Sequence, residues 1–384
     1  MTPSLPLDMA TPAYVLDVAA LKRNLATVAR IRREAGCKVL LATKAWAMPA
    51  AFSLMRELLD GTTASGEYEA RLGRQAFGKE VHVYAPAYAA GEVERLTALA
   101  DHIYFNSPEQ IGRFGRLAKA AGARIGARIN PGYSNATLGG ALYDPCAPYS
   151  RFGTIRAEID KLPWDVPGLE IDIFHVHALC ESMADGSAGL IEHVAREFAP
   201  YIRKVKAVNF GGGHFINKPG YDVAKLIAAI KAFRAEFPEV EVILEPGGGI
   251  VVDTGYLVAT VIGLHWNEQH IAILDTSASC HMPDVLEVPY TPAVIGAAAP
   301  GVHPYTYILG GKTCMTGDVI GEFSFPEPLK VGSRVIFTDM MQYSFVKNTT
   351  FNGTPRPDLG MLEEDGSYRV VQSFGYEDFR RTLG

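Results

Sequence analysis

A single lysine, Lys44, stands at the end of an apolar stretch, residues 39–43, that we expect to form a strand buried on both faces. Burying an ammonium group is costly unless the group is paired or neutralised. Burial also lowers the pKa of a lysine and leaves the nucleophilic amine that Schiff-base chemistry requires. The alternative is an ammonium that extends past the strand end into solvent. Lys44 is therefore a candidate covalent anchor, with that alternative left open.

Two histidines, His175 and His177, follow one another at the end of another expected strand. Residues i and i+2 of a strand point to the same side, so the pair would be suited to binding a metal, as in a metal-dependent hydrolase. Such a site needs further His or Asp ligands, whereas the other strand ends offer Lys44, Gly211 and Glu245. An imidazole stacked on an aromatic cofactor therefore explains His177 better than a metal does.

Two glycine runs, residues 211–213 and 247–249, come directly after expected strands. Glycine lets the backbone approach a ligand closely and point N–H groups at a phosphate. Either run alone could be a plain turn, but phosphate sites of parallel barrels favour the loops after strands seven and eight. The pair therefore indicates a phosphate site, with Gly212, Gly213 and Gly247 as candidate contacts.

Glu245 ends the apolar strand expected at 240–245 and needs a cationic partner there. A protonated pyridine nitrogen fits, because a neighbouring carboxylate raises its pKa and keeps the ring an electron sink. An ion pair with an arginine such as Arg128 is the alternative. A lysine, phosphate-binding loops, a carboxylate and a stacking imidazole together point to pyridoxal 5′-phosphate (PLP).

The elements that must position these residues alternate along the chain. Apolar periodicity predicts helices at 19–34, 50–59, 67–77, 91–100, 107–121, 189–198 and 223–237, with Ser107 as N-cap and Gln110 at the capping-box position. We expect strands at 11–17, 39–43, 62–65, 80–84, 102–105, 123–130, 169–177, 207–210 and 240–245, and a long loop at 131–152. Eight strands from residue 39 on, most of them separated by helices, predict a parallel (β/α)8 barrel with its active site at the C-terminal strand ends.

Beyond residue 250 the pattern changes to β-branched and aromatic runs at 250–264, 270–275, 335–338 and 368–372, separated by Pro and Gly. This pattern predicts an antiparallel β-rich domain, to which the opening strand could also belong. We divide the chain into residues 1–30, a strand and helix that join the β-domain to the barrel, residues 31–250, the PLP-binding barrel, and residues 251–384, the C-terminal β-domain.

The composition narrows the classes of function. The chain has 384 residues, 48% of them hydrophobic, which allows a large core. Its net charge of -6 argues against nucleic-acid binding. No stretch has the length of a membrane span, and no secretory signal is visible at the first residues. Five cysteines without CxxC pairing predict neither a disulfide scaffold nor a zinc site, so we expect a cytoplasmic protein.

Several longer motifs carry a family resemblance: residues 142–153 (LYDPCAPYSRFG), 175–181 (HVHALCE), 275–287 (DTSASCHMPDVLE), 310–318 (GGKTCMTGD) and 373–379 (SFGYEDF). With Lys44, they make the chain resemble PLP enzymes of the alanine-racemase and ornithine/diaminopimelate decarboxylase type, a barrel followed by a β-domain. More narrowly, the chain is similar to the carboxynorspermidine/carboxyspermidine decarboxylases. The resemblance implies a PLP-dependent decarboxylase for such a cationic substrate. Another carboxylated amine, such as carboxyaminopropylagmatine, a diamino acid or a specialised-metabolite precursor, is the alternative substrate.

The resemblance also assigns roles to single residues. It implies a homodimer in which Cys314 reaches the partner's cofactor and returns a proton to the decarboxylated carbon, whereas a lone cysteine is more often an inert buried thiol. Tyr343 matches a tyrosine that binds the phosphate, and Arg128 joins the cofactor-binding set. Four acids would attract the cationic substrate, or be ordinary solvated carboxylates: Glu181, Asp284, Glu287 and Asp318. A PLP-binding protein without catalysis would need neither the Cys314 loop nor the β-domain.

Two positions depart from the family pattern. Gly248 and Gly249 follow the Glu-Pro-Gly sequence where related decarboxylases have Arg or the pair Glu-Ala, and Trp46 stands where a smaller aromatic residue is expected. Both positions are expected near the cofactor or the substrate, so they bear on substrate identity more than on reaction type.

Overall fold

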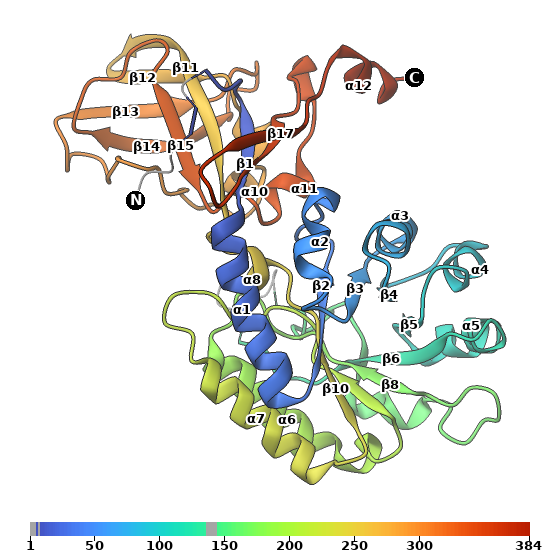
Figure 1. Ribbon diagram of the computed structural model, residues 1–384. Helices are drawn as coiled ribbons and strands as arrows, with labels where there is room; N and C mark the ends of the chain where they lie inside the picture. The colour runs from blue at the N-terminus through green and yellow to red at the C-terminus, as the bar shows by residue number, and fades with distance from the viewer. Residues whose placement is uncertain (1–4, 7, 136–143) are drawn as a thin grey trace. The chain divides into compact units, whose positions relative to one another are not determined.

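The computed structural model of the protein describes residues 5, 6, 8–135 and 144–384. The chain divides into two compact units: residues 24–250 form the barrel unit, and residues 1–23 with 251–384 form the β unit (Figure 1). The first boundary falls inside helix α1 (Val18–Ala35). Residues 142 and 143 of the first family motif, and residues 136–143 of the expected long loop, lie outside the described residues.

The barrel unit is the predicted parallel (β/α)8 barrel. Its strands are β2 (Lys38–Ala42), β3 (Gly61–Ala64), β4 (Glu80–Tyr84), β5 (His102–Phe105), β6 (Arg124–Asn130), β8 (Ile173–His175), β9 (Ala207–Asn209) and β10 (Glu241–Leu244). They pair in the order β5-β4-β3-β2-β10-β9-β8-β6, and the pairing of β5 with β6 closes the ring. A two-residue strand, β7 (Thr154–Ile155), adds to β6.

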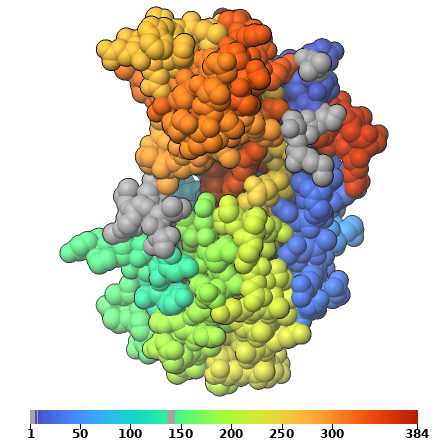
Figure 2. Space-filling model, turned by 90° about the vertical axis from the view of Figure 1, so that its left-hand side faces the viewer, coloured from blue at the N-terminus to red at the C-terminus, as the bar shows by residue number. Residues whose placement is uncertain are grey.

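Helices follow most of these strands: α2 (Phe52–Met55), α3 (Glu67–Leu72), α4 (Glu92–Thr97), α5 (Pro108–Ala120), α6 (Ala184–Ile202), α7 (Val223–Glu236) and α8 (Gly248–Val251). The green to yellow surface in Figure 2 belongs to the part of the chain that contains α6 and α7. Ser107 caps α5 as predicted, its hydroxyl accepting a bond from the N–H of Gln110. The Gln110 side chain instead accepts from the N–H of Asn106, one residue before the predicted partner.

Of the five barrel strands that end one or two residues earlier than the apolar pattern predicts, three lead to Lys44, His177 and Glu245. β2 ends at Ala42 rather than residue 43, β8 at His175 rather than 177, and β10 at Leu244 rather than 245. At each end the chain leaves the ladder for a loop, so apolar character continues past the last paired residue. Lys44 and His177 therefore lie two residues beyond their strands, on loops rather than on strand ends.

The interior of the barrel is filled by side chains from several strands. Its apolar layer consists of Leu40, Tyr104, Ile173, Ala207 and Ile243. The Tyr104 ring fits because β6 has glycine opposite: a Cβ on Gly126 would lie 2.3 Å from that ring. Several barrel strands also carry buried polar residues, among them His82, His175 and Asn209.

The β unit contains β1 (Ala13–Asp17), β11 (Gly255–Asn267), β12 (Gln269–Leu274), β13 (Tyr305–Gly310), β14 (Val319–Phe325), β15 (Arg334–Thr338), β16 (Asp358–Leu362) and β17 (Tyr368–Gln372). Most of its pairings are antiparallel, but β1 with β16 and β12 with β13 are parallel. The opening strand β1 lies between β11 and β16, so it belongs to the β unit, as the sequence analysis allowed. The sequence pattern missed β13, β14 and β16, and the strand predicted from residue 250 begins at Gly255, after α8.

Short helices lie between strands of this unit: α9 (Ala278–His281), α10 (Asp284–Glu287), α11 (Ser344–Lys347) and α12 (Tyr376–Arg381). Across the described part of the chain, none of the helices has both the length and the apolar character needed to cross a membrane.

Candidate active site

Five neighbouring strands of the barrel bring the candidate residues to one rim. Each of these neighbouring strands carries one candidate residue: Lys44 after β2, Glu245 after β10, Gly212 after β9, His177 after β8 and Arg128 within β6. The strands are parallel, so their C-terminal ends meet at the same edge. Residues far apart in the sequence are thus brought together by strand order alone.

Lys44 lies in the turn after β2, and its side chain is exposed to solvent. The preceding residue fixes this turn, because the Thr43 hydroxyl donates to the Thr63 carbonyl at 2.9 Å. Surrounding protein and the charge of Arg128 lower the pKa of Lys44, against weaker opposing effects of Glu245 and Glu69. An accessible amine with a lowered pKa is suited to nucleophilic attack on an aldehyde.

Glu245 is buried, with 3% of its surface exposed. Its carboxylate accepts a hydrogen bond from Asn209 at 2.7 Å, and lies 3.2 Å from His175 Nε2 and 3.6 Å from His82 Nδ1. Burial by itself would raise the pKa of Glu245, but the histidines outweigh it and hold that pKa well below its usual range. Glu245 is therefore an ionised carboxylate inside the barrel.

Arg128 provides a different contact from the ion pair considered for it. Its guanidinium donates to the carbonyl of His177 at 2.7 Å and lies over the Tyr84 ring, 4.5 Å from the centroid. Burial lowers the pKa of Arg128 below its ordinary value. Arg128 thus fixes the backbone that carries His177, while the partners of Glu245 are Asn209 and two histidines.

The two histidines of the expected pair have different surroundings. His175 is buried and stacks on Tyr104, with 4.5 Å between ring centroids. His177 accepts a hydrogen bond at Nδ1 from the N–H of Gly212, which leaves its proton on Nε2. Desolvation, with the charge of Lys44, lowers the pKa of His177 well below its ordinary value, so the ring is neutral. Among the described residues, the group spaced to hold a metal includes neither histidine.

The glycine run after β9 supports His177 more than the sequence suggested. The N–H of Gly211 donates to Asn209 and that of Gly212 to His177, so both are used within the barrel. A Cβ on Gly212 would lie 2.7 Å from the Glu245 carbonyl oxygen and 3.1 Å from His177 Cε1. Gly213 has φ of 83°, a backbone that favours glycine. The prediction that Gly212 points its N–H at a phosphate is therefore not supported by this geometry.

The second glycine run allows two loops to approach each other. A Cβ on Gly247 would lie 2.6 Å from the Ala45 Cβ, and one on Gly249 would lie 2.2 Å from the His214 carbonyl oxygen. Gly248 and Gly249 form the first residues of α8. The side chain of Trp46, the other departure from the family pattern, is fully buried against Phe52, and its indole N–H has no partner among the described residues.

In the β unit, Cys314 is exposed on the loop between β13 and β14, and its N–H donates to Asn352 at 2.8 Å. Asp318 ends the same loop but is buried, with 4% of its surface exposed. Its carboxylate accepts bonds from the Ser277 and Thr313 hydroxyls, at 3.0 and 2.6 Å, and from two backbone N–H groups. These four donors make Asp318 an anchor of the Cys314 loop and give no support to its predicted contact with substrate.

Two of the other predicted acids share one cation. Lys347 binds both Asp284 and Glu287, so the group retains one net negative charge when all three are ionised. Tyr343 and the exposed Glu181 have φ of 50° and 44°, in a region that residues other than glycine rarely adopt. Such strain is often found at functional sites.

Two residues that contact Glu245 from inside the barrel were not predicted from the sequence. Asn209 donates to both Tyr104 and Glu245, and His82 lies between Glu245 and Glu80. The sequence does contain a sign of both Asn209 and His82, because each is a polar residue within an otherwise apolar strand, at a position that faces the barrel interior.

A lysine, an ionised carboxylate, a neutral imidazole and close-packed glycine loops on adjacent strand ends form a donor set that fits PLP. The chain also matches the family model described as "Pyridoxal-dependent decarboxylase, C-terminal sheet domain" over residues 13–341. It is 40% identical to carboxyaminopropylagmatine decarboxylase of Synechocystis sp., over 98% of this chain and 96% of the relative. It is 38% identical to carboxynorspermidine/carboxyspermidine decarboxylase of Campylobacter jejuni, over 96% and 97%.

A solved structure agrees with these matches. Carboxynorspermidine decarboxylase from Campylobacter jejuni, complexed with norspermidine, has a TM-score of 0.89 and 37% identity, covering 97% of this chain and 100% of that chain. Diaminopimelate decarboxylase from Helicobacter pylori, at 19% identity and a TM-score of 0.83, has the same fold. On the matches and the geometry of its barrel rim, the chain belongs to the pyridoxal-dependent decarboxylase family.

Proposed function

We propose that this PLP-dependent decarboxylase acts on carboxynorspermidine or carboxyspermidine and releases norspermidine or spermidine. The observation that carries the proposal is the near-full-length similarity to the Campylobacter jejuni enzyme, whose solved structure binds norspermidine. The chemistry is consistent, because these substrates have one carboxylate, which leaves, on an otherwise cationic chain. Their recognition requires acids and no second arginine for a carboxylate.

PLP, when bound, supplies the electron sink for loss of CO2. In our proposal the Lys44 amine holds the cofactor and Glu245 keeps a proton on its ring nitrogen. The neutral imidazole of His177 packs against the ring, and Arg128 fixes the His177 backbone. Gly213, Gly247 and Tyr343 are the proposed phosphate contacts, with Gly212 holding His177 by its N–H; this last role replaces the direct contact expected from the sequence.

The β unit contributes the proton and the substrate tail in this proposal. Cys314 returns a proton to the carbon that loses the carboxylate, at the site of the partner subunit in a homodimer with shared sites. Asp284, Glu287 and Glu181 attract the cationic tail, and Asp318 holds the Cys314 loop in place. We further propose that the enzyme is cytoplasmic, which its free thiols favour.

The similarity to the Synechocystis enzyme gives carboxyaminopropylagmatine as the second candidate substrate. Its guanidinium would need a planar carboxylate partner, whereas a primary amine is satisfied by a looser group of acids. The two candidate substrates therefore differ in the group at the end of the cationic tail, a guanidinium or a primary amine.

Measuring CO2 release with carboxynorspermidine, carboxyspermidine, carboxyaminopropylagmatine and diaminopimelate at equal concentrations tests the proposal. We expect the highest kcat/KM for one of the first two, and little turnover of diaminopimelate, which carries a second carboxylate. A higher kcat/KM for carboxyaminopropylagmatine would favour the second candidate substrate. Absence of turnover with all four compounds would refute both candidate substrates.

A further inference from the structure

A row of ionisable side chains passes through the barrel interior below Glu245. His82 on β4 lies 3.6 Å from Glu245 by Nδ1 and 3.3 Å from Glu80 by Nε2. Glu80 in turn pairs with Lys38 at 2.7 Å, and Lys38 lies 3.2 Å from Glu241. The row alternates acid and base from the cofactor end of the barrel towards the start of the strands, where Glu241 is partly exposed.

His82 is the only fully enclosed base in this row, with none of its surface exposed. Each of its ring nitrogens faces a carboxylate: Nε2 lies 3.3 Å from Glu80 and Nδ1 lies 3.6 Å from Glu245, with the Tyr104 hydroxyl oxygen 2.9 Å from Nδ1. A ring that lies between two carboxylates is best satisfied when both of its nitrogens carry protons.

Charge balance leads to the same assignment. Desolvation disfavours a charged His82, but hydrogen bonds to Glu245 and Glu80 outweigh it and raise the pKa of His82 above its ordinary value. His175, the nearer histidine, faces Arg128 and Lys44, and desolvation with those charges lowers its pKa to about 4. With the pKa of His175 lowered and that of His82 raised, His82 is the histidine beside Glu245 that is suited to carry a positive charge.

We propose that His82 is a positioning residue: a buried imidazolium that bridges Glu245 and Glu80 and keeps Glu245 ionised for the ring nitrogen of PLP. This inference deepens the proposed function and rests on the role given there to Glu245. An ionised carboxylate without such a partner would be costly in the barrel interior, because water cannot reach it.

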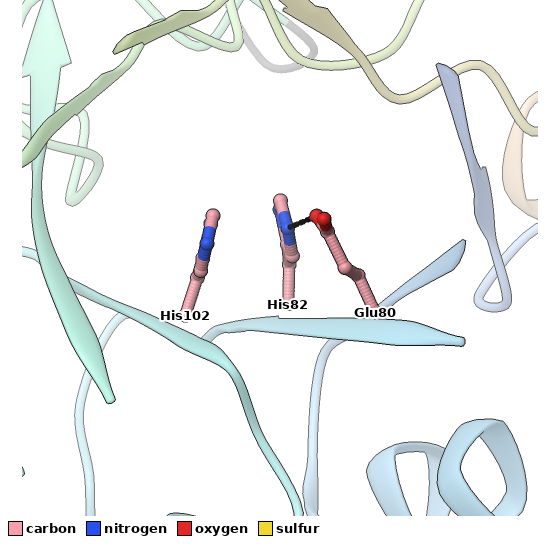
Figure 3. A group of neighbouring side chains, drawn as sticks. All are labelled: Glu80, His82 and His102. Carbon is pink, nitrogen blue, oxygen red and sulfur yellow. Dashed lines mark hydrogen bonds and ion pairs between the residues drawn. The ribbon is translucent and has the colours of Figure 1, made fainter. Parts of the chain in front are cut away.

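The orientation of the neighbouring His102 argues against the alternative that His82 binds a metal. Glu80, His82 and His102 have ligand atoms within 4.8 Å of one another, but the two rings are stacked, with centroids 3.9 Å apart and planes at 25° (Figure 3). Nitrogen lone pairs lie in the ring planes, so those of two nearly parallel rings do not converge on one ion. Lys38 already pairs with Glu80 and would repel a metal cation.

The stacking instead supports a cation on His82. Desolvation and the charge of His82 lower the pKa of His102 to about 2, so its ring is neutral. The face of a neutral aromatic ring attracts a cation lying against it. His102 thus forms one wall of the His82 site while contributing no charge.

The test is histidine NMR of the PLP-loaded enzyme with 13C at the ring Cε1, each signal assigned by substitution. We expect the His82 signal to show a protonated ring at pH 7 and the His102 signal a neutral one. Glu80→Gln should lower the pKa of His82 by at least about one unit, a tenfold fall in the charged fraction at pH values above that pKa. A neutral His82 at pH 6.5, or one zinc ion per chain lost on His102→Phe, would overturn the proposal.

A second measurement uses the cofactor spectrum and does not depend on turnover. His82→Gln should shift the absorption of bound PLP in the same direction as Glu245→Gln, and adding it to Glu245→Gln should change little more. The matched control His102→Phe keeps a ring against His82 and should leave the spectrum unchanged. An unchanged spectrum in Glu245→Gln would refute the proposed role of Glu245, whereas a shift there with no effect of His82→Gln would refute only the role of His82.

Discussion

The candidate residues of the barrel unit and those of the β unit are positioned in different ways. In the barrel, Lys44, Glu245 and His177 follow the parallel strands β2, β10 and β8 of one ring, so closure of the ring is sufficient to bring them to one rim. In the β unit, Cys314 and the acids Asp284 and Glu287 lie on a loop and a four-residue helix that local hydrogen bonds hold. The proposed cofactor contacts are thus positioned by the barrel strands, whereas the proposed substrate and proton-donor residues are positioned by a loop and a short helix.

The buried polar groups of the two units show a second difference. The barrel interior contains an ionised Glu245 with its chain of partners, whereas in the β unit His281 is buried neutral, its ring satisfied by the Thr276 hydroxyl and the Pro355 carbonyl. Glu245 in the barrel lies beside ionisable groups, whereas His281 and Asp318 in the β unit are satisfied by neutral donors and acceptors. A change in the barrel should therefore have the larger effect on chemistry.

The largest effect should come from Lys44. Lys44→Ala should lower decarboxylation by at least about 10⁴-fold, as removal of a covalent catalytic group does elsewhere. Borohydride should fix PLP to the wild-type protein and not to this variant, which mass spectrometry of the peptide would detect. Lysine 38 provides the control, because Lys38→Ala should retain the fixed cofactor. Covalent labelling that survives in Lys44→Ala would show that another lysine is the anchor.

Cys314 should have the next largest effect. A general acid typically contributes about 10²–10⁴-fold, so Cys314→Ala should lower turnover by that much and leave the absorption of bound PLP intact. Cys146→Ala is the matched control, because that thiol is half-buried in the barrel unit. Normal turnover of the Cys314→Ala variant would show that Cys314 of the β unit does not deliver the proton.

Mixing two inactive variants tests whether the units cooperate across a dimer. Lys44→Ala and Cys314→Ala subunits that reassort at random should recover about a quarter of full activity, because a mixed dimer has one intact shared site of two. Mixed dimers that form, as native mass spectrometry can show, but remain inactive would place both residues at the site of the same subunit.

The acids of the β unit should affect binding more than chemistry. Asp284→Asn with Glu287→Gln leaves Lys347 unpaired and reverses the local charge, so KM for a carboxylated polyamine should rise about tenfold, an effect of about 1.4 kcal/mol. The kcat should change little, and added salt should narrow the difference between wild type and variant. An unchanged KM at low salt would show that these acids do not meet the substrate.

The smallest effect concerns acid stability. Burial lowers the pKa of His175 and His214 in the barrel unit, and of His281 in the β unit, to about 4. Because the unfolded chain binds these protons first, each site costs stability as the pH falls from about 6.5 towards 4, by up to about 1.4 kcal/mol per pH unit. Hydrogen exchange between pH 7 and 5 should show barrel peptides losing protection faster than β-unit peptides. Equal loss in the two units would contradict the unequal distribution of buried neutral histidines.

The sequence determined the barrel and the identity of several rim residues. Alternating apolar strands and helices are local patterns, and a lysine, a glutamate or a glycine run after such a strand is visible without coordinates. The family motifs, which include His177 and Cys314, are equally a property of the sequence.

Only the tertiary structure decided which groups compensate one another. His82 and Glu245 are 163 positions apart in the sequence, and nothing local to either shows that the barrel places them 3.6 Å apart. The same holds for Asp318, whose carboxylate accepts four hydrogen bonds that hold the Cys314 loop. Strand order and burial set the pairing of charges, because the energy of a buried charge depends on neighbours that only the closed fold assembles.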